Sequence, residues 1–311
     1  MSLPPSEIPL GAMRFNSDSQ KLEYWNGSAW FQIQTFSPTL DGGVRGLFFG
    51  GDPSRDTNMD YITIPTRGNS IDFGDYPISN GTGSRGIVAS NTRGLFAGGD
   101  SPGDVNTVDF ITISSTGSTS DFGDIGTGGH RSAAGVSNQT RMVAAGGDKD
   151  PHPNQMNTIN FVTIATTGNF VDSGSDILDA KQSLTNSVNS PIRGIFSGGF
   201  TPSAVTRIEF INISTMGNGQ DFGTLSSNAN TEQGTVSSST RGLIKISIDG
   251  TNADQVDTIQ ITTLGDSVNF GNLSETTNGS ASTSNSVRAV SYTHLRAHET
   301  GRNLVCRLLL E

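Results

Sequence analysis

Residues 93–100 read RGLFAGGD, and this stretch decides the fold because related octapeptides return along the chain at an almost constant spacing. The related copies begin at Arg45, Arg141, Arg193 and Arg241, and Arg288 opens a further one. The spacings between successive arginines are 48, 48, 52, 48 and 47 residues. A period of this length is typical of arrays in which one supersecondary unit stacks on the next. We therefore expect five tandem repeats, at residues 45–92, 93–140, 141–192, 193–240 and 241–287.

Each repeat opens with an apolar run, and in the first four repeats a glycine pair closes it. A glycine pair suits a sharp exit from a strand or a close approach of two backbones. The pairs are Gly50 and Gly51, Gly98 and Gly99, Gly146 and Gly147, and Gly198 and Gly199. After a polar loop comes an alternating segment such as residues 108–113, VDFITI, whose period of two predicts a strand.

A turn glycine ends the alternating segment, and in four repeats an aromatic residue stands five positions later, usually within an Asp-Phe-Gly triplet. These aromatic residues are Phe73, Phe122, Phe222 and Phe270. The third repeat carries Ser173 instead, so we expect that repeat to pack less well. A small-residue segment such as residues 131–138, RSAAGVSN, then leads into the next arginine.

Four short strands in each unit of 40 to 50 residues are typical of a β-propeller blade. Residues 45–287 resemble kelch repeats, in which a small-residue strand, an apolar strand ending in Gly-Gly, an alternating strand and an aromatic residue follow one another. Two departures are that phenylalanine stands where kelch repeats usually carry tryptophan, and that the fifth repeat lacks the glycine pair. The resemblance implies an all-β, kelch-like β-propeller of four-stranded blades, and a β-solenoid is the alternative.

The segment before the repeats, residues 1–44, follows a different pattern. Residues 12–15 and 21–25 are expected to be strands around a turn at 17–20, and Asn26 and Gly27 mark a second tight turn before Trp30. This β-meander resembles short modules of tail-fibre and other virion proteins of tailed bacteriophages. The repeats are similar to predicted structural proteins of phages that infect marine cyanobacteria. The alternative is a strand pair that caps the first blade.

Residues 290–311 obey none of the repeat's rules. Their sequence, VSYTHLRAHETGRNLVCRLLLE, resembles the translation of a sequencing adaptor, so we interpret it as an artefact of a metagenomic read. The natural sequence is then expected to continue past Ala289 with the rest of a sixth repeat. This tail holds Cys306, the single cysteine of the chain, as well as His294 and His298.

The bulk composition excludes several classes of protein. A net charge of −10 argues against a nucleic-acid partner, because binding phosphates draws on clustered Lys and Arg. No segment approaches the ~18 apolar residues of a membrane span, so membrane insertion is not expected. The N-terminus lacks a basic start and an apolar stretch, which predicts synthesis in the host cytoplasm without a signal peptide.

Candidate catalytic groups are few. His130 and His152 have no motif partner and are interpreted as solvated loop residues. The Asp-Phe-Gly triplets recur with the repeat, which indicates a structural role rather than magnesium binding. Asp52, Asp100 and Asp148 follow glycine pairs, but with Asp56 and Asp104 they match no known calcium spacing, so we assign them to turns. We expect no metal site, no cofactor and no enzymatic activity.

These observations favour a non-catalytic virion structural protein, a tail fibre or similar appendage located in the phage particle. Its partners would be other virion proteins or a host-surface glycan or receptor, because a rigid scaffold that presents variable loops suits binding. Self-association into a homo-oligomer is also open. Two alternative functions remain: an intracellular kelch-type scaffold for protein interactions, and a glycan-active enzyme whose active site lies beyond this sequence.

Overall fold

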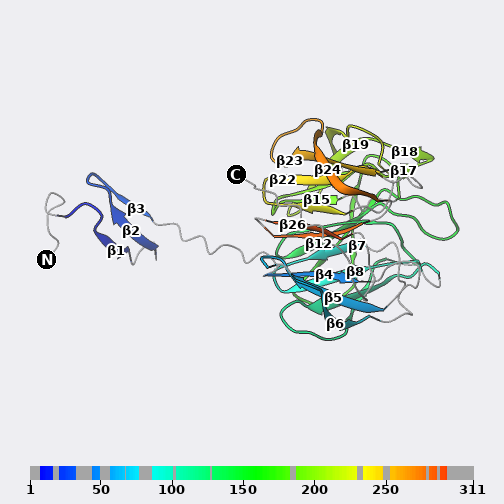
Figure 1. The fold of residues 1–311 in the computed structure, drawn as a ribbon, viewed down its shortest axis with the longest axis horizontal. Coiled ribbons are helices and arrows are strands. Elements are labelled where there is room, and N and C mark those ends of the chain that lie inside the picture. The colour runs from blue at the N-terminus through cyan, green and yellow to red at the C-terminus, as the bar shows by residue number, and fades with distance from the viewer. Residues whose placement is uncertain are drawn as a thin grey trace. The chain divides into compact units, whose positions relative to one another are not determined.

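The computed structural model describes the backbone of residues 8–16, 21–32, 44–49, 57–66, 68–76, 86–100, 103–126, 128–182, 187–229, 234–247, 253–277, 280–285 and 288–292. Every regular element in these ranges is a β-strand, and within them there is no helix. The chain divides into two compact units, Met1–Leu40 and Asp41–Glu311 (Figure 1). The protein is therefore all-β, and each unit is described by itself.

The first unit is an antiparallel meander of three strands, β1 (Met13–Asn16), β2 (Lys21–Trp25) and β3 (Trp30–Gln32). The buried Trp25 ring packs on Trp30 at a centroid distance of 5.5 Å. Buried Glu23 accepts hydrogen bonds from Arg14 Nε and Asn16 Nδ2, each at 2.9 Å. Asn26 Oδ1 caps the turn that follows β2 by accepting from the Ala29 amide at 2.8 Å. The turn expected at 17–20 lies outside the described residues.

The second unit consists of small antiparallel sheets, which we number by chain order. The first sheet contains β4 (Arg45–Phe49), β5 (Asn58–Thr63) and β6 (Ile71–Asp75), and the second contains β7 (Gly86–Ala89), β8 (Arg93–Ala97), β9 (Thr107–Thr112) and β10 (Ser120–Asp124). The third contains β11 (Ala134–Ser137), β12 (Arg141–Ala145), β13 (Thr158–Thr163) and β14 (Val171–Asp176). The fourth contains β15 (Ser187–Asn189), β16 (Arg193–Ser197), β19 (Arg207–Asn212) and β20 (Gln220–Thr224), with a separate hairpin of β17 (Phe200–Thr201) and β18 (Ser203–Ala204).

The fifth sheet contains β21 (Thr235–Ser237), β22 (Arg241–Lys245), β23 (Ala253–Gln260) and β24 (Val268–Thr277). The sixth contains β25 (Ala281–Ser284) and β26 (Ala289–Tyr292). Residues 290–292 of the segment that resembles adaptor sequence thus lie in β26, and residues 293–311 lie outside the described part of the chain.

The sheets do not begin where the repeats were placed. Each small-residue strand pairs with the apolar strand of the next repeat, as β7 does with β8. A tight turn makes this pairing, since the Ser90 amide donates to the Arg93 carbonyl at 2.8 Å. The same turn joins β25 to β26 through Asn285 and Arg288 at 2.9 Å. Boundaries drawn at the arginines therefore cut each sheet between its first and second strands.

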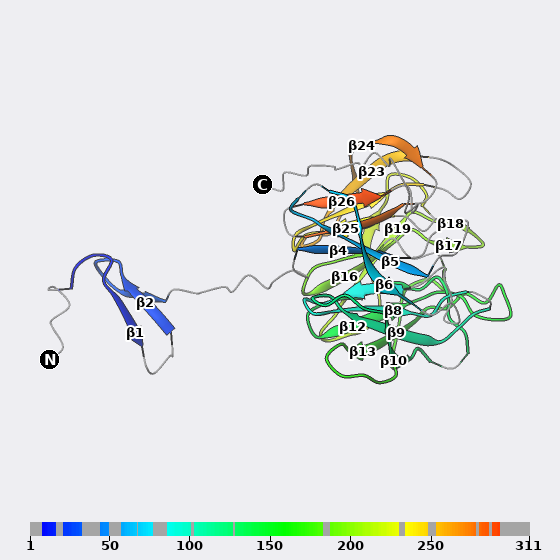
Figure 2. The same cartoon turned by 60° about the horizontal axis from the view of Figure 1, so that its bottom comes forward.

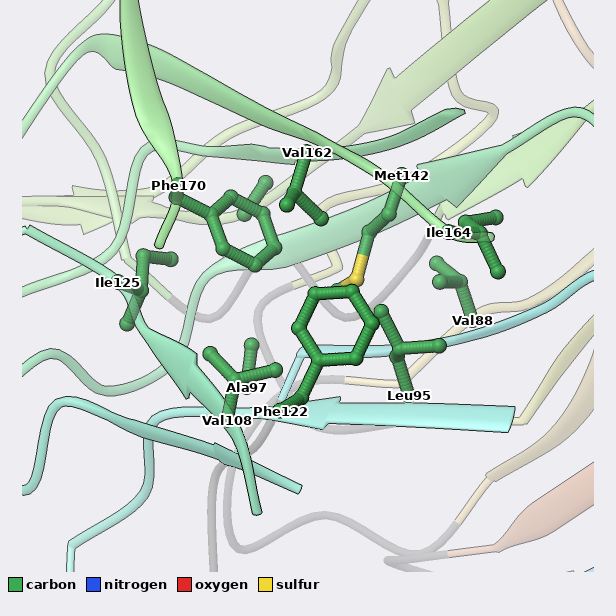
Figure 3. Packing of buried hydrophobic residues seen from close by; sticks show 11 residues of the cluster. Val88, Leu95, Ala97, Val108, Phe122, Ile125, Met142, Val162, Ile164 and Phe170 are labelled. Atoms are coloured by element: carbon green, nitrogen blue, oxygen red, sulfur yellow. The ribbon is translucent and has the colours of Figure 1, made fainter. Parts of the chain in front are cut away.

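Consecutive sheets pack face to face and share apolar clusters. Between the second and third sheets, Phe122 and Leu95 meet Met142 and Phe170, and each of these side chains is at most 7% exposed (Figure 3). Comparable clusters join the first sheet to the second, the third to the fourth, the fourth to the fifth and the fifth to the sixth. Because second strands such as β8, β12 and β16 are covered on both faces, their sequences are continuous runs of apolar and small residues rather than alternating ones.

In each of the first four sheets, an arginine at the start of the apolar strand ties the sheet to the following one. Its guanidinium donates to a carbonyl just after the third strand of the following sheet. The pairs are Arg45 to Ile113 at 2.9 Å, Arg93 to Ile164 at 2.9 Å, Arg141 to Ile213 at 3.0 Å and Arg193 to Ile261 at 2.9 Å. The same four arginines stack on an aromatic ring of their own sheet, with distances to the ring centroid of 4.6 to 4.7 Å. These four arginines thus join adjacent sheets.

The sixth sheet contacts the first in the same way. Arg288 donates to the Ile64 carbonyl at 2.8 Å, although the two residues are 224 positions apart. Strand β25 lies beside β4 (Figure 2). A Cβ on Gly46 would lie 2.3 Å from Thr283. The corresponding contact between the third and fourth sheets would place a Cβ on Gly194 2.5 Å from Val136. The sixth sheet therefore lies next to the first, as each earlier sheet lies next to the one that follows it.

The Asp-Phe-Gly triplets serve contacts between sheets. The carbonyl of the triplet's phenylalanine accepts a bond from the turn glycine of the next sheet, as Phe122 does from the Gly168 amide at 2.8 Å. The glycine of that triplet, Gly123, has a φ of 148°, and a Cβ there would lie 2.5 Å from the Gly168 carbonyl oxygen. The third residue must therefore be glycine because two backbones touch at this point.

One of the recurring aromatic positions has a different environment. Phe270 is 41% exposed, whereas Phe73, Phe122 and Phe222 are at most 3% exposed. On the preceding strand, Thr258 stands where the other sheets have an aromatic ring, so Phe270 lacks the edge-to-face contact that Phe222 makes with Phe210. Phe270 therefore recurs in the sequence without the burial of the other three.

The weaker packing expected from Ser173 is confined to the outer strand of the third sheet. Strand β14 has no buried side chain. Phe170, just before this strand, is 7% exposed and fills the cluster instead. Strand β12 is as buried as the second strands of the neighbouring sheets, so the effect of Ser173 is limited to the outer strand.

Replacing Phe222 by alanine is expected to lower the free energy of unfolding by about 3–5 kcal/mol, because a buried ring leaves a cavity. The same change at the half-exposed Phe270 is expected to cost about 1 kcal/mol or less. Urea titrations of both variants measure the difference. Equal losses at the two positions would contradict the difference in burial.

Candidate functional site: the loops after the glycine pairs

The glycine pairs carry the chain from the second strand into loops at one end of the sheets. Gly50 and Gly51 lie outside the described residues. The other three pairs all have positive φ angles: 70° and 132° at Gly98 and Gly99, 63° and 100° at Gly146 and Gly147, and 66° and 104° at Gly198 and Gly199. L-residues with a side chain rarely adopt such angles. The pairs therefore allow a turn that other residues would resist.

The second glycine of each pair also donates its amide to the next sheet. Gly99 donates to the His130 carbonyl at 2.9 Å, and Gly199 donates to the Ala229 carbonyl at 2.7 Å. Gly147 does the same to the Lys181 carbonyl at 2.9 Å. Each acceptor lies shortly before the first strand of the following sheet, so the pairs fix the loops of neighbouring sheets against each other.

The fifth sheet has no glycine pair, and a lysine stands near its loop instead. Lys245, the last residue of β22, is 2% exposed. Burial lowers the pKa of Lys245 to about 8, although the Asp254 carboxylate acts in the opposite direction. Burial thus weakens the positive charge of this amine.

One group of charged side chains gathers where the loops of the second and third sheets meet. It contains Asp104 from the second sheet, and Arg131, Asp148, Asp150 and His152 from the third. His152 Nδ1 lies 2.8 Å from Asp148 Oδ2, and its Nε2 lies 3.1 Å from Asp104 Oδ2 and 3.0 Å from Asp150 Oδ1. Arg131 Nη2 lies 3.2 Å from Asp148 Oδ2. We call this group the His152 cluster.

Burial and hydrogen bonding act differently on the two inner carboxylates of the His152 cluster. Burial raises the pKa of Asp104, and the charges of His152 and Arg131 offset only part of this effect. Burial alone would also raise the pKa of Asp148, but hydrogen bonds from the Asn154 amide, Arg131 and His152 outweigh it and leave that pKa below its usual value. Asp148 is therefore the better-satisfied carboxylate of the two.

Asp148 has the turn-stabilising role that the sequence analysis assigns to the aspartates after glycine pairs. Its Oδ1 accepts from the Lys149 amide at 3.1 Å and from the Asn154 amide at 2.6 Å. Asp52 and Asp56 lie outside the described residues, as does the loop that holds them.

His130 is not the solvated loop residue that the sequence suggested, whereas His152 is an exposed loop residue, as expected, with charged neighbours that the sequence did not indicate. His130 is 6% exposed, and its Nε2 lies 2.8 Å from the Gly146 carbonyl oxygen. Burial lowers the pKa of His130 despite that backbone bond. The His152 side chain is 29% exposed and is surrounded by carboxylates. The local sequence gave no signal for either environment because the surrounding groups come from another sheet or from a folded-back loop.

The third strands also carry buried acidic residues that were not predicted from the sequence. Glu209 Oε2 accepts from the Leu178 amide of the preceding sheet at 2.7 Å, and its Oε1 lies 2.7 Å from Lys181 Nζ, with both side chains fully buried. Asp257 Oδ2 accepts from the Ser226 amide of the preceding sheet at 3.1 Å. Burial would raise the pKa of Asp257, but bonds from Ser226, Ser267 and Gln255 lower it. The sequence contained a signal for these residues, because an acidic residue recurs inside the alternating segment.

No protein-family model matches the chain, and no curated protein matches it either. Within the described ranges, no helix is long and apolar enough to cross a membrane. The candidate site is therefore defined by its geometry and its sequence pattern.

Changing Gly98 to alanine is expected to lower the free energy of unfolding by about 2–3 kcal/mol. The added Cβ would lie 2.1 Å from the His130 carbonyl oxygen, at a φ of 70°. Gly103 is the matched control, since a Cβ there meets nothing within 4 Å, and Gly103→Ala should leave stability nearly unchanged. Chemical denaturation of the two variants tests this, and a harmless Gly98→Ala would deny the pair its structural role.

Proposed function

We propose that the sheets of the second unit are the blades of a kelch-like β-propeller with six blade positions. The observation that supports closure is the hydrogen bond from Arg288 to the Ile64 carbonyl, which repeats between the sixth and first sheets the bond made by four other arginines. The packing of Gly46 on Thr283 supports the same arrangement. A β-solenoid would have two ends, and its first and last coils would not meet.

Four features of the fifth sheet and its surroundings support a sixth blade with further strands. Among the described residues, the Arg241 side chain has no carbonyl partner in the sixth sheet, and a hollow lined by Arg241, Leu243 and Arg288 opens beside it. Phe270 is half exposed, and a Cβ on Gly271 would meet nothing within 4 Å. In other blades these positions face the third strand and the turn of the next sheet. We therefore assign the outer strands of the sixth blade to sequence outside the described residues.

Closure is tested by the arginines themselves. Arg288→Ala is expected to lower the free energy of unfolding by about 1–3 kcal/mol, as Arg93→Ala should, because a charged hydrogen bond to a neighbouring blade is lost. Arg241→Ala is the control and should cost about 1 kcal/mol or less. An Arg288→Ala variant as stable as Arg241→Ala would overturn the ring.

For the protein as a whole we propose a non-catalytic virion structural role, in a tail fibre or similar appendage. The observation that carries this proposal is that recurring and varying residues of the repeat occupy different places. The residues that recur, such as Arg93, Gly99 and Phe122, make contacts between sheets, whereas the residues that vary lie in loops at the strand ends. A rigid scaffold with variable loops suits binding to a glycan, a receptor or another virion protein.

The N-terminal unit supports the same assignment, because it is a separate small meander that resembles modules of tailed-phage virion proteins. An intracellular kelch-type scaffold is the second candidate, and a glycan-active enzyme completed by sequence outside this chain is the third. The acidic charge of −10 disfavours a nucleic-acid partner for any of them.

The experiment is to recover the complete locus with its neighbouring genes and to analyse purified virions from the same source by mass spectrometry. We expect genes for tail or capsid proteins beside this one, and peptides from the repeats in the particles. We also expect the rest of a sixth repeat after Arg288. A locus in a cellular genome, or particles that lack these peptides, would refute the virion role.

A further inference from the structure

The imidazole of His152 lies among three carboxylates. Its Nδ1 is 2.8 Å from Asp148 Oδ2, while its Nε2 is 3.0 Å from Asp150 Oδ1 and 3.1 Å from Asp104 Oδ2. A neutral imidazole carries one proton, and the hydrogen bond to Asp148 places that proton on Nδ1. The lone pair on Nε2 then points toward two carboxylate oxygens. Such an arrangement is repulsive unless a second imidazole proton or a metal cation lies among the three atoms.

Asp104 gives an independent indication of a ligand. Its side chain is 3% exposed, and its Oδ2, which faces His152, is buried without a hydrogen bond of normal geometry in the described part of the chain. The nearest guanidinium atom, Arg131 Nε, is 3.9 Å from the other oxygen, beyond hydrogen-bond distance. A buried carboxylate oxygen left unsatisfied is costly, so such an atom calls for a partner.

We propose that Asp104, Asp150 and His152 bind one divalent transition-metal ion, with Zn²⁺ the best match. One ligand atom from each of the three residues lies within 4.8 Å of the other two. The three carboxylates and the Arg131 guanidinium leave two negative charges when His152 is neutral, and a divalent ion balances them. This proposal does not depend on the virion role.

The donor set selects the class of metal. One imidazole nitrogen and two carboxylate oxygens suit Zn²⁺ and its neighbours, whereas Ca²⁺ and Mg²⁺ prefer oxygen ligands alone. Asp148 completes the pattern, because a carboxylate that accepts the second imidazole N–H orients a metal-binding histidine. The Asp150 side chain is 66% exposed, so the site opens to solvent on that side and has room for a water ligand.

The ion would join loops of two neighbouring sheets. Asp104 follows the second strand of the second sheet, and Asp150 and His152 lie in the loop between β12 and β13 of the third. That loop belongs to the repeat with a spacing of 52 residues rather than 47 or 48. The metal therefore orders the longest of the loops through which the proposed scaffold would bind a partner.

The test is isothermal titration of the untagged, metal-stripped full chain with ZnCl₂. One equivalent is expected to bind, and His152→Gln and Asp104→Asn should each weaken binding at least tenfold, while an equal concentration of Ca²⁺ should not compete. Exposed Asp121, outside the cluster, provides the matched control, and Asp121→Asn should bind as the wild type does. A triple variant, His294→Ala/His298→Ala/Cys306→Ser, should also retain one equivalent, because those residues of the tail are potential zinc ligands.

A second readout guards against loss of folding. Asp150 is mostly exposed, so Asp150→Asn should leave the Tm of the metal-free protein unchanged and yet lower zinc affinity and abolish the rise in Tm that Zn²⁺ gives the wild type. The proposal is overturned if the wild type binds no stoichiometric zinc, if binding survives in Asp150→Asn and His152→Gln, or if it disappears in the triple tail variant. In the first case a protonated His152 accounts for the geometry.

Discussion

The structure depends on how closely each sheet approaches its neighbours. A face-to-face stack of small sheets buries both faces of strands such as β8 and β12, and the backbones of adjacent sheets touch at fixed points. Gly123 against Gly168 is one such point, and Gly98 against His130 is another, where any added Cβ would overlap a carbonyl. Glycine is required at these points because nothing else fits, and the recurrence of the glycines along the chain is a direct consequence.

Polar groups that become buried where two sheets pack closely need hydrogen-bond partners from the neighbouring sheet. The recurring arginines other than Arg241 each supply a donor for a carbonyl, as Arg193 does for Ile261, and an acidic residue such as Glu209 supplies an acceptor for an amide. The fully buried ion pair of Glu209 with Lys181 belongs to the same set of contacts. Breaking one member of such a pair typically destabilises a protein by about 3–5 kcal/mol, so these positions tolerate little change.

The contacts between sheets also decide where function can lie. The recurring residues are occupied in joining sheets, which leaves sequence variation to the loops, and the loop between β12 and β13 contributes three residues of the His152 cluster. His152 meets carboxylates from its own loop and from Asp104 of another sheet. Two neighbouring sheets thus build a polar site that neither would form alone, and such a site suits a protein whose scaffold is fixed and whose surface varies.

The sequence by itself determined the all-β class and the succession of strands and turns along each repeat, because alternation, glycine and Asx chemistry act over a few residues. It also located the glycine pairs and the Asp-Phe-Gly triplets. It did not determine the exposure of Phe270, the rescue of the third sheet by Phe170 or the environments of His130 and His152, since each depends on side chains from another strand or loop. The approach of the sixth sheet to the first was likewise decided only by tertiary structure, because Arg288 and Ile64 are 224 residues apart and meet only when the intervening sheets have stacked.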